Sequence, residues 1–128
     1  MTSYGKIVSA VVENGLDWLP HYVGRVKRAR GGNTSFETKL SMEPIDYFYR
    51  NIYFTYINET HAVENRQTIG IDNLMFATDY PHSASTWPKS QEIVARDMTN
   101  HGVSDEEHRK LIRDNVIRCY NIQVPVLV

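Results

Sequence analysis

The sequence predicts an α/β fold in which three parallel strands are each followed by helical sequence. Residues 6–13, 51–57 and 74–77 are short runs rich in β-branched, aromatic or aliphatic side chains, as in the strands of a parallel sheet. Each of these three runs is followed along the chain by helical sequence with apolar residues at helical spacing. Strands that alternate with helices in this way pair in parallel through right-handed crossovers.

The first strand-helix unit covers residues 6–30. Asn14-Gly15 supplies a turn after the strand, and apolar residues recur at helical spacing from about Leu16. Basic residues in the last turn suit the negative end of the helix dipole, and Gly31-Gly32 ends the helix. A basic segment of this kind can also bind RNA, but a solvated helix end explains it better.

The second unit begins after a polar loop, residues 31–43. Pro44 fits the first position of a short helix, and the second strand, residues 51–57, follows it. Residues 59–70 then predict a short helix that ends at Gly70.

The third unit carries a carboxylate at the end of a buried strand. Asp79 follows the apolar run 74–77, and Pro81 stops the strand where the side chains of Asp79 and His82 can converge. In an α/β barrel, this edge is where the active site lies. We therefore favour an active-site role for Asp79 over simple capping of the next turn.

Two helices close the chain. The first covers about residues 89–100, and the second starts with a capping box formed by Ser104 and Glu107. Its predicted buried stripe includes Cys119, for which inert packing is a better explanation than nucleophilic chemistry. The residues expected to be buried across the fold are Val11, Leu74, Phe76, Ile112 and Val116.

The length of the chain limits what this pattern can build. The 128 residues make one domain, whereas a complete (β/α)8 TIM barrel needs about 250 residues. The sequence therefore predicts a single partial barrel domain, residues 1–128, with about three strand-helix units.

Because an open three-stranded sheet has two unpaired edges, we expect a homo-oligomer. We also expect the apolar tail, residues 124–128, to dock on its own core or on a second subunit.

Composition excludes several classes of protein. The net charge is −1, so nothing indicates a nucleic-acid partner. No apolar run approaches the length of a membrane span, and the amino terminus lacks the apolar segment of a signal peptide. A single cysteine excludes an intramolecular disulfide framework. The sequence predicts a soluble, cytoplasmic protein.

Several motifs together resemble the carboxyl-terminal part of the amidohydrolase-related metal-dependent hydrolases, in the branch that includes the aminocarboxymuconate-semialdehyde-decarboxylase-like enzymes. The motif that carries most of the likeness is Thr78-Asp-Tyr-Pro-His82, followed by Thr86-Trp-Pro88. The other motifs are Val12-Glu-Asn-Gly15 with Trp18-Leu-Pro20, Tyr47-Phe-Tyr-Arg-Asn-Ile-Tyr53, and Asp114-Asn115 with Arg118-Cys-Tyr120. The resemblance implies that the three strands are the sixth, seventh and eighth of the barrel.

The resemblance also implies roles for individual residues. Asp79 matches the aspartate that ends the eighth strand and binds a divalent metal, typically zinc, or acts on the metal-bound water. Glu13 matches the place of a catalytic histidine in the decarboxylase-like members, which favours hydrolysis over decarboxylation, although turn chemistry explains Glu13 about equally well. His82 and Trp87 are candidate contacts to a small-molecule substrate, although a Trp-Pro pair more often packs the barrel rim.

The chain lacks the other metal ligands that the resemblance implies. The family takes them from a His-x-His pair and from a histidine on the fifth strand, and this sequence has no His-x-His. We therefore expect this chain alone to bind no catalytic metal. Two functions remain open: a hydrolase segment that carries the eighth-strand aspartate and is inactive alone, or a non-catalytic, self-associating α/β module derived from that family.

Overall fold

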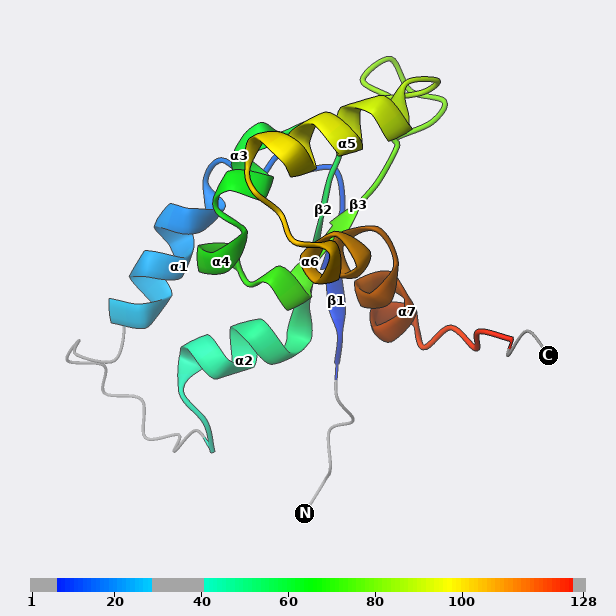
Figure 1. Ribbon diagram of the computed structural model, residues 1–128. Helices are drawn as coiled ribbons and strands as arrows, with labels where there is room; N and C mark the ends of the chain where they lie inside the picture. The colour runs from blue at the N-terminus through cyan, green and yellow to red at the C-terminus, as the bar shows by residue number, and fades with distance from the viewer. Residues whose placement is uncertain (1–6, 29–40, 126–128) are drawn as a thin grey trace.

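A computed structural model describes residues 7–28 and 41–125 of the chain. Three strands, β1 (Ser9–Val11), β2 (Ile52–Tyr56) and β3 (Leu74–Phe76), form one parallel sheet in the order β1-β2-β3 (Figure 1). In this sheet Phe54 pairs with Val11 on one side and with Leu74 on the other. The predicted α/β class and the parallel pairing are therefore confirmed.

The outer strands are shorter than the apolar runs that predict them. Among the described residues β1 pairs only with the first part of β2, Ile52 to Phe54, and β3 pairs only with its last part, Phe54 to Tyr56, so each outer strand has only three paired residues. Asn51, which was expected to begin the second strand, instead ends the preceding helix.

Helices follow the first two strands in the expected order. They are α1 (Leu19–Arg28), α2 (Pro44–Asn51), α3 (Thr60–Glu64) and α4 (Arg66–Ile69). α1 begins at Leu19 because Leu16 forms a turn in which its carbonyl accepts from the amide of Leu19 at 3.1 Å, and Pro20 fits the first turn of a helix. The expected end of this helix at Gly31-Gly32 lies outside the described residues. The helix expected over residues 59–70 is interrupted at Asn65.

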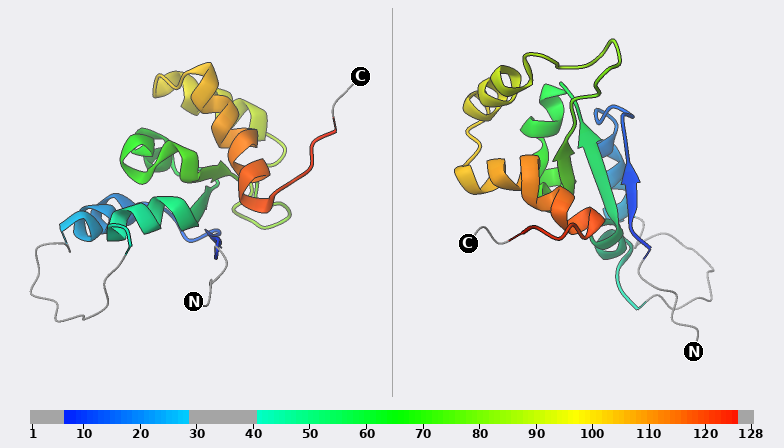
Figure 2. Two further views of the ribbon diagram at one scale, coloured as in Figure 1. Left: turned by 90° about the horizontal axis from the view of Figure 1, so that it is seen from below. Right: turned by 90° about the vertical axis from the view of Figure 1, so that its right-hand side faces the viewer.

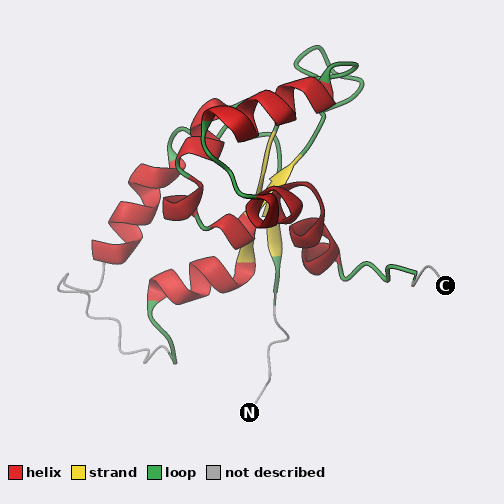
Figure 3. Cartoon of the chain, viewed as in Figure 1, coloured by secondary structure: helices red, strands yellow, loops and turns green. Residues whose placement is uncertain are grey.

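Residues 90–120 are mostly helical (Figure 3). α5 (Ser90–Asn100) precedes a continuous helical segment made of α6 (Asp105–Arg109), a π-helical stretch (Lys110–Asp114) and α7 (Asn115–Tyr120). The capping box is present as predicted, with the Ser104 hydroxyl accepting from the amide of Glu107 at 3.2 Å and the Glu107 carboxylate accepting from the amide of Ser104 at 3.1 Å.

The hydrophobic core lies between the sheet and the helices that surround it (Figure 2). Of the residues expected to be buried, Leu74 is fully buried, whereas Val11, Phe76 and Val116 are half-buried. The core cluster is built from Leu16, Leu19, Val23, Phe48, Phe54, Tyr56, Ala62, Val63, Ile69, Leu74, Val94, Met98 and Leu111.

The prediction for Ile112 is wrong, because its side chain is 46% exposed. Leu111 instead occupies the inward position, and the next inward position, four residues later, is taken by the fully buried Asn115. Cys119 is half-buried, and burial raises the pKa of its thiol, in agreement with a packing role.

The described part of the tail does not pack on the core as expected. Residues 121–125 are exposed, and Val124 is 46% exposed. The expected docking on a second subunit stays a prediction, and residues 126–128 lie outside the described part. Within the described residues, no helix has the length and apolar character needed to cross a membrane.

Candidate functional site

The candidate site lies at the carboxyl edge of the sheet. Glu13 follows the end of β1 and Asp79 follows the end of β3. Because all three strands are parallel, these two ends meet at the same edge, on either side of the end of β2. The predicted placement of Asp79 just after a buried strand is therefore correct.

The backbone of both Glu13 and Asp79 adopts the left-handed conformation. The φ angle is 57° at Glu13 and 55° at Asp79, a conformation that residues other than glycine seldom adopt. At Glu13 the conformation is held by its amide, which donates to the hydroxyl of Thr55 on the neighbouring strand at 3.1 Å. Strained backbone that the surrounding structure enforces is concentrated at functional sites.

Asp79 and His82 form a close pair. Nδ1 of His82 lies 2.7 Å from Oδ1 of Asp79, and the amide of His82 donates to the carbonyl of Asp79 at 2.8 Å. The Asp79 side chain is only 7% exposed, whereas that of His82 is 69% exposed. The hydrogen bond to Asp79 raises the pKa of His82, and the charges of Asp79 and Glu13 raise it further.

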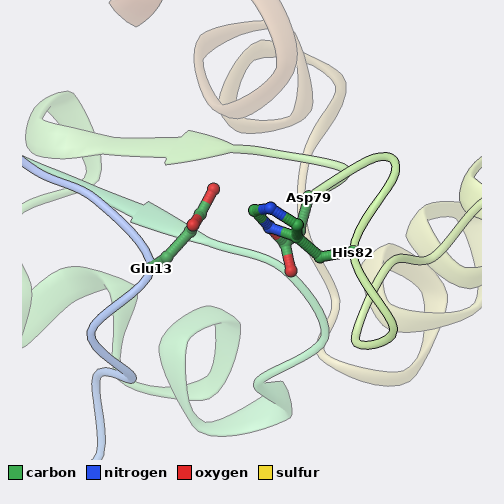
Figure 4. Close-up of side chains that lie close together, drawn as sticks. All are labelled: Glu13, Asp79 and His82. Carbon is green, nitrogen blue, oxygen red and sulfur yellow. The ribbon is translucent and has the colours of Figure 1, made fainter.

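Glu13 completes a cluster of three side chains (Figure 4). Each of Glu13, Asp79 and His82 offers one oxygen or nitrogen atom, and these three atoms lie within 4.8 Å of one another. The carboxylate of Glu13 points from the end of β1 towards the other two. The structure thus brings together three of the four residues that sequence analysis selected.

Trp87, the fourth selected residue, lies in the loop after β3. Its indole is 63% exposed and packs edge-on against Tyr80, with ring centroids 5.9 Å apart. The two ends of this loop are joined by hydrogen bonds to the backbone carbonyl of Thr78. This carbonyl accepts from the Ser85 hydroxyl at 2.7 Å and from the Thr86 amide at 3.1 Å.

His61, a histidine that follows β2 by a few residues, does not join the cluster. Its Nδ1 lies 2.9 Å from the carboxylate of Glu64 on α3, and both side chains are well exposed. This pair has the same three-residue spacing as Asp79 and His82, but among the residues that the structure describes no third ligand residue lies in range of it.

The donor set of the cluster fits a divalent cation. Two carboxylates and one imidazole give three protein ligands, the number that a catalytic zinc site uses before its open position. Carboxylate oxygens also suit manganese, and imidazole suits zinc or iron. Three candidate ligands therefore come together around Asp79, so the expectation that this chain alone binds no catalytic metal loses its geometric basis.

Two residues of this site were not selected from the sequence. Thr55 holds the backbone of Glu13, and Tyr80 packs against Trp87. The hydroxyl of Thr55, in the middle of an apolar strand, is a signal that could have identified it, because a buried hydroxyl needs a partner. Tyr80 lies inside the motif already selected.

A model of the amidohydrolase family matches residues 54–122, which is more than half of the chain. The chain belongs to the amidohydrolase family. This match begins within β2 and includes Asp79, His82 and Trp87, whereas Glu13 lies before it.

Solved structures of larger proteins have the same fold over most of this chain. An amidohydrolase from Mycobacterium avium subsp. paratuberculosis K-10 is 23% identical, with a TM-score of 0.72 over 91% of this chain and 28% of its own. The 5-carboxyvanillate decarboxylase of Sphingomonas paucimobilis is 22% identical, with a TM-score of 0.61 over 83% of this chain and 31% of its own.

A third structure contains a metal. It is a dihydroxybenzoic acid decarboxylase from Polaromonas sp. JS666 with bound manganese and the inhibitor 2-nitroresorcinol, 21% identical, with a TM-score of 0.58 over 81% of this chain and 31% of its own. No curated protein sequence matches the chain. The chain spans less than a third of the length of each of these three structural relatives.

Proposed function

We propose that this chain is the carboxyl-terminal sector of a metal-dependent hydrolase barrel, with β1, β2 and β3 as the sixth, seventh and eighth strands. Family membership and the structural likeness to larger amidohydrolase-type proteins support this proposal. The observation that carries it is the nearly buried Asp79 carboxylate at the carboxyl edge of the sheet, with one atom each of Glu13, Asp79 and His82 within 4.8 Å of one another.

Asp79 acts at a divalent metal in this proposal. Such an ion, when bound, polarises a carbonyl group and lowers the pKa of its water to near neutrality. Asp79 would hold the ion or accept a proton from water. His82 keeps the Asp79 side chain oriented through the 2.7 Å contact. A small-molecule substrate lies at the rim, where Trp87 and His82 face solvent.

Hydrolysis is favoured over decarboxylation by Glu13. In this proposal Glu13 takes the position at which decarboxylase-like members carry a catalytic histidine. A carboxylate at this position suits a base that accepts a proton from water, as hydrolysis requires, whereas decarboxylation needs a group that donates a proton to a carbanion. Two of the structural relatives are named as decarboxylases, so both reactions belong in the test.

The test is an activity screen with the chain alone and with the chain joined to the five preceding strand-helix units of a structural relative. Its substrates are esters, amides, lactones and aromatic carboxylates, with and without manganese or zinc. We expect turnover only in the joined protein and only with metal, and we expect Asp79→Asn to lower the rate at least about hundredfold, which is about 2.7 kcal/mol.

Asp72→Asn is the matched control, because Asp72 lies just before β3, at the opposite edge of the sheet, and is half-exposed. Hydrolysis that persists in Asp79→Asn, or that needs no divalent metal, would contradict the proposed function.

A non-catalytic, self-associating module is the second candidate. β1 has an unpaired outer edge among the described residues, and Ile7, Val8 and Val12 are 70%, 45% and 44% exposed. Apolar side chains on an open edge favour pairing with another chain. A stable oligomer that shows no turnover in either form of the screen would support this candidate.

A further inference from the structure

We propose that the tail of one copy of this chain docks in an apolar groove of a second copy, and that two copies exchange their tails in this way about a two-fold axis. The part of the tail concerned is residues 121–125, which directly follow α7. The groove shares no residue with the cluster of Glu13, Asp79 and His82, so the contact does not depend on the proposed function.

The groove lies between α5, the end of β3 and the helical segment that begins with α6. Its volume is about 310 Å³, and the described residues that line it include no lysine, arginine, aspartate or glutamate. Its apolar lining comes from Phe76 of β3, from Val94 and Ala95 of α5, and from Ile112 of the π-helical stretch. Ile112 is 46% exposed. An open apolar surface of this kind is typical of a place where another chain binds.

The tail has the matching chemistry. Residues 119–125 contain no charged side chain, and Ile122 and Val124 are 48% and 46% exposed. Pro125 favours extended backbone at Val124, and side chains two residues apart on an extended segment lie on the same side. Ile122 and Val124 can therefore enter one groove together.

The backbone at the end of α7 sets the direction in which the tail leaves the helix. Asn121 adopts the left-handed conformation with a φ angle of 51°, and the amide of Ile122 donates to the carbonyl of Ile117 at 3.0 Å. After this turn the tail extends away from α5, which forms one wall of the groove (Figure 1). Because Val124 and Ile112 are both exposed, the tail does not fill the groove of its own chain.

A second copy of the chain is favoured as the partner because one chain carries both halves of the contact. In an isologous pair each tail meets the groove of the other copy, so both contacts form at once. The free energy gained on burial grows with the apolar area removed from water, and the exchange covers Ile112, Ile122 and Val124 in each of the two copies.

Disulfide cross-linking between two differently tagged copies of the full chain tests the contact. One copy carries Ile112→Cys and the other carries Val124→Cys, both with Cys119→Ser, which removes the single native thiol. The side chains of Ile112 and Val124 are nearly half exposed, and circular dichroism checks that each variant is folded. Under mild oxidation the mixed cross-link should form at least about tenfold faster than in the control below, because docking raises the effective concentration of the two thiols.

Val8→Cys provides the matched control. Val8 is 45% exposed, nearly the same as Ile112, but it lies just before β1 and outside the groove. Mixed with the copy that carries Val124→Cys, it should give cross-links only at the background rate. Adding Ile122→Asp to the copy with Val124→Cys should lower the cross-linking to Ile112→Cys to this background, whereas Ile122→Leu should preserve it.

Three results would overturn the exchange of tails. A cross-link between Ile112→Cys and Val124→Cys that forms no faster than the control would show that the groove takes no tail from a second copy. Faster cross-linking of Val124→Cys to Val8→Cys would assign the tail to the edge of β1 instead. In a chain that carries both Ile112→Cys and Val124→Cys, an internal bridge without any bridge between copies would show that the tail docks on its own groove.

Discussion

The side-chain amide of Asn115 donates a hydrogen bond to the backbone carbonyl of Leu74 at 2.7 Å and so joins the last helix to β3. The same amide donates to the carbonyl of Ile71 at 2.8 Å, and Asn115 is completely buried. Arg118, one turn further on, bonds to the hydroxyl of Tyr53 at 2.9 Å and to the carbonyl of Asp72. The carboxyl-terminal helix is therefore attached to the sheet by polar contacts as well as by Leu111.

Replacing Asn115 with Ala should lower the free energy of unfolding by about 2 to 4 kcal/mol, because one buried and one partly buried carbonyl lose their donor and each unsatisfied group costs about 1–3 kcal/mol. Urea denaturation measures the change. Asn100→Ala, at the exposed end of α5, is the control and should change stability little. Equal effects of the two substitutions would mean that the buried amide contributes nothing.

Phe76→Ala should destabilise the chain by about 3 kcal/mol, the lower end of the range for phenylalanine truncation. Phe76 is half-buried rather than fully buried, and it packs edge-on against Tyr56 with centroids 5.7 Å apart. Thermal unfolding followed by circular dichroism provides the measurement. An unchanged melting temperature would contradict the assignment of Phe76 to the core.

Glu107 should make stability depend on pH in the acidic range. Hydrogen bonds from Arg66 and from the amide of Ser104 lower the pKa of this carboxyl below its ordinary value of 4.5. A lowered pKa in the folded state means that the stabilisation is complete above the ordinary value and is lost as the pH falls through the folded-state pKa.

The corresponding measurement is the difference in urea midpoint between the original chain and Glu107→Gln. The difference should amount to about 1 kcal/mol at pH 7 and should shrink below the ordinary pKa of the carboxyl. Glu106→Gln is the control, since Glu106 lies in the same turn but is exposed. A difference that stays constant down to pH 2 would show that the charge of Glu107 is not responsible.

We expect the isolated chain to form a homo-oligomer. Its sheet has two unpaired edges among the described residues, and Ile7 and Val124 are largely exposed. Sedimentation at several concentrations measures the state of association, with and without residues 123–128. A monomer at high micromolar concentration would exclude association through the sheet edges and the tail.

Sequence patterns predicted the order and type of the elements because each apolar run or helical stripe is a local property. They predicted the position of Asp79 for the same reason, since a strand followed by Pro81 has to end nearby. The convergence of Glu13 on this residue depends on the order and register of three strands. Such non-local geometry is not encoded in any single segment.

The error at Ile112 has a related cause. A helical stripe of apolar residues predicts an apolar residue at each inward position, but the inward position after Leu111 is occupied by Asn115. A buried amide is favourable there only because the carbonyls of Ile71 and Leu74 lie opposite it. The partners of a buried polar group are usually distant in sequence, so residue periodicity does not reveal them.

The position of β2 between the two carboxylate-bearing strands has a consequence for folding. β1 pairs only with β2 in the described part of the chain, and β2 follows it after some forty residues, so Glu13 has no fixed place until this long-range pairing forms. Asp79 is fixed only when β3 has been added on the other side. Glu13 and Asp79 therefore meet only when both outer strands have paired with β2, and their mutual repulsion acts only once the sheet is complete.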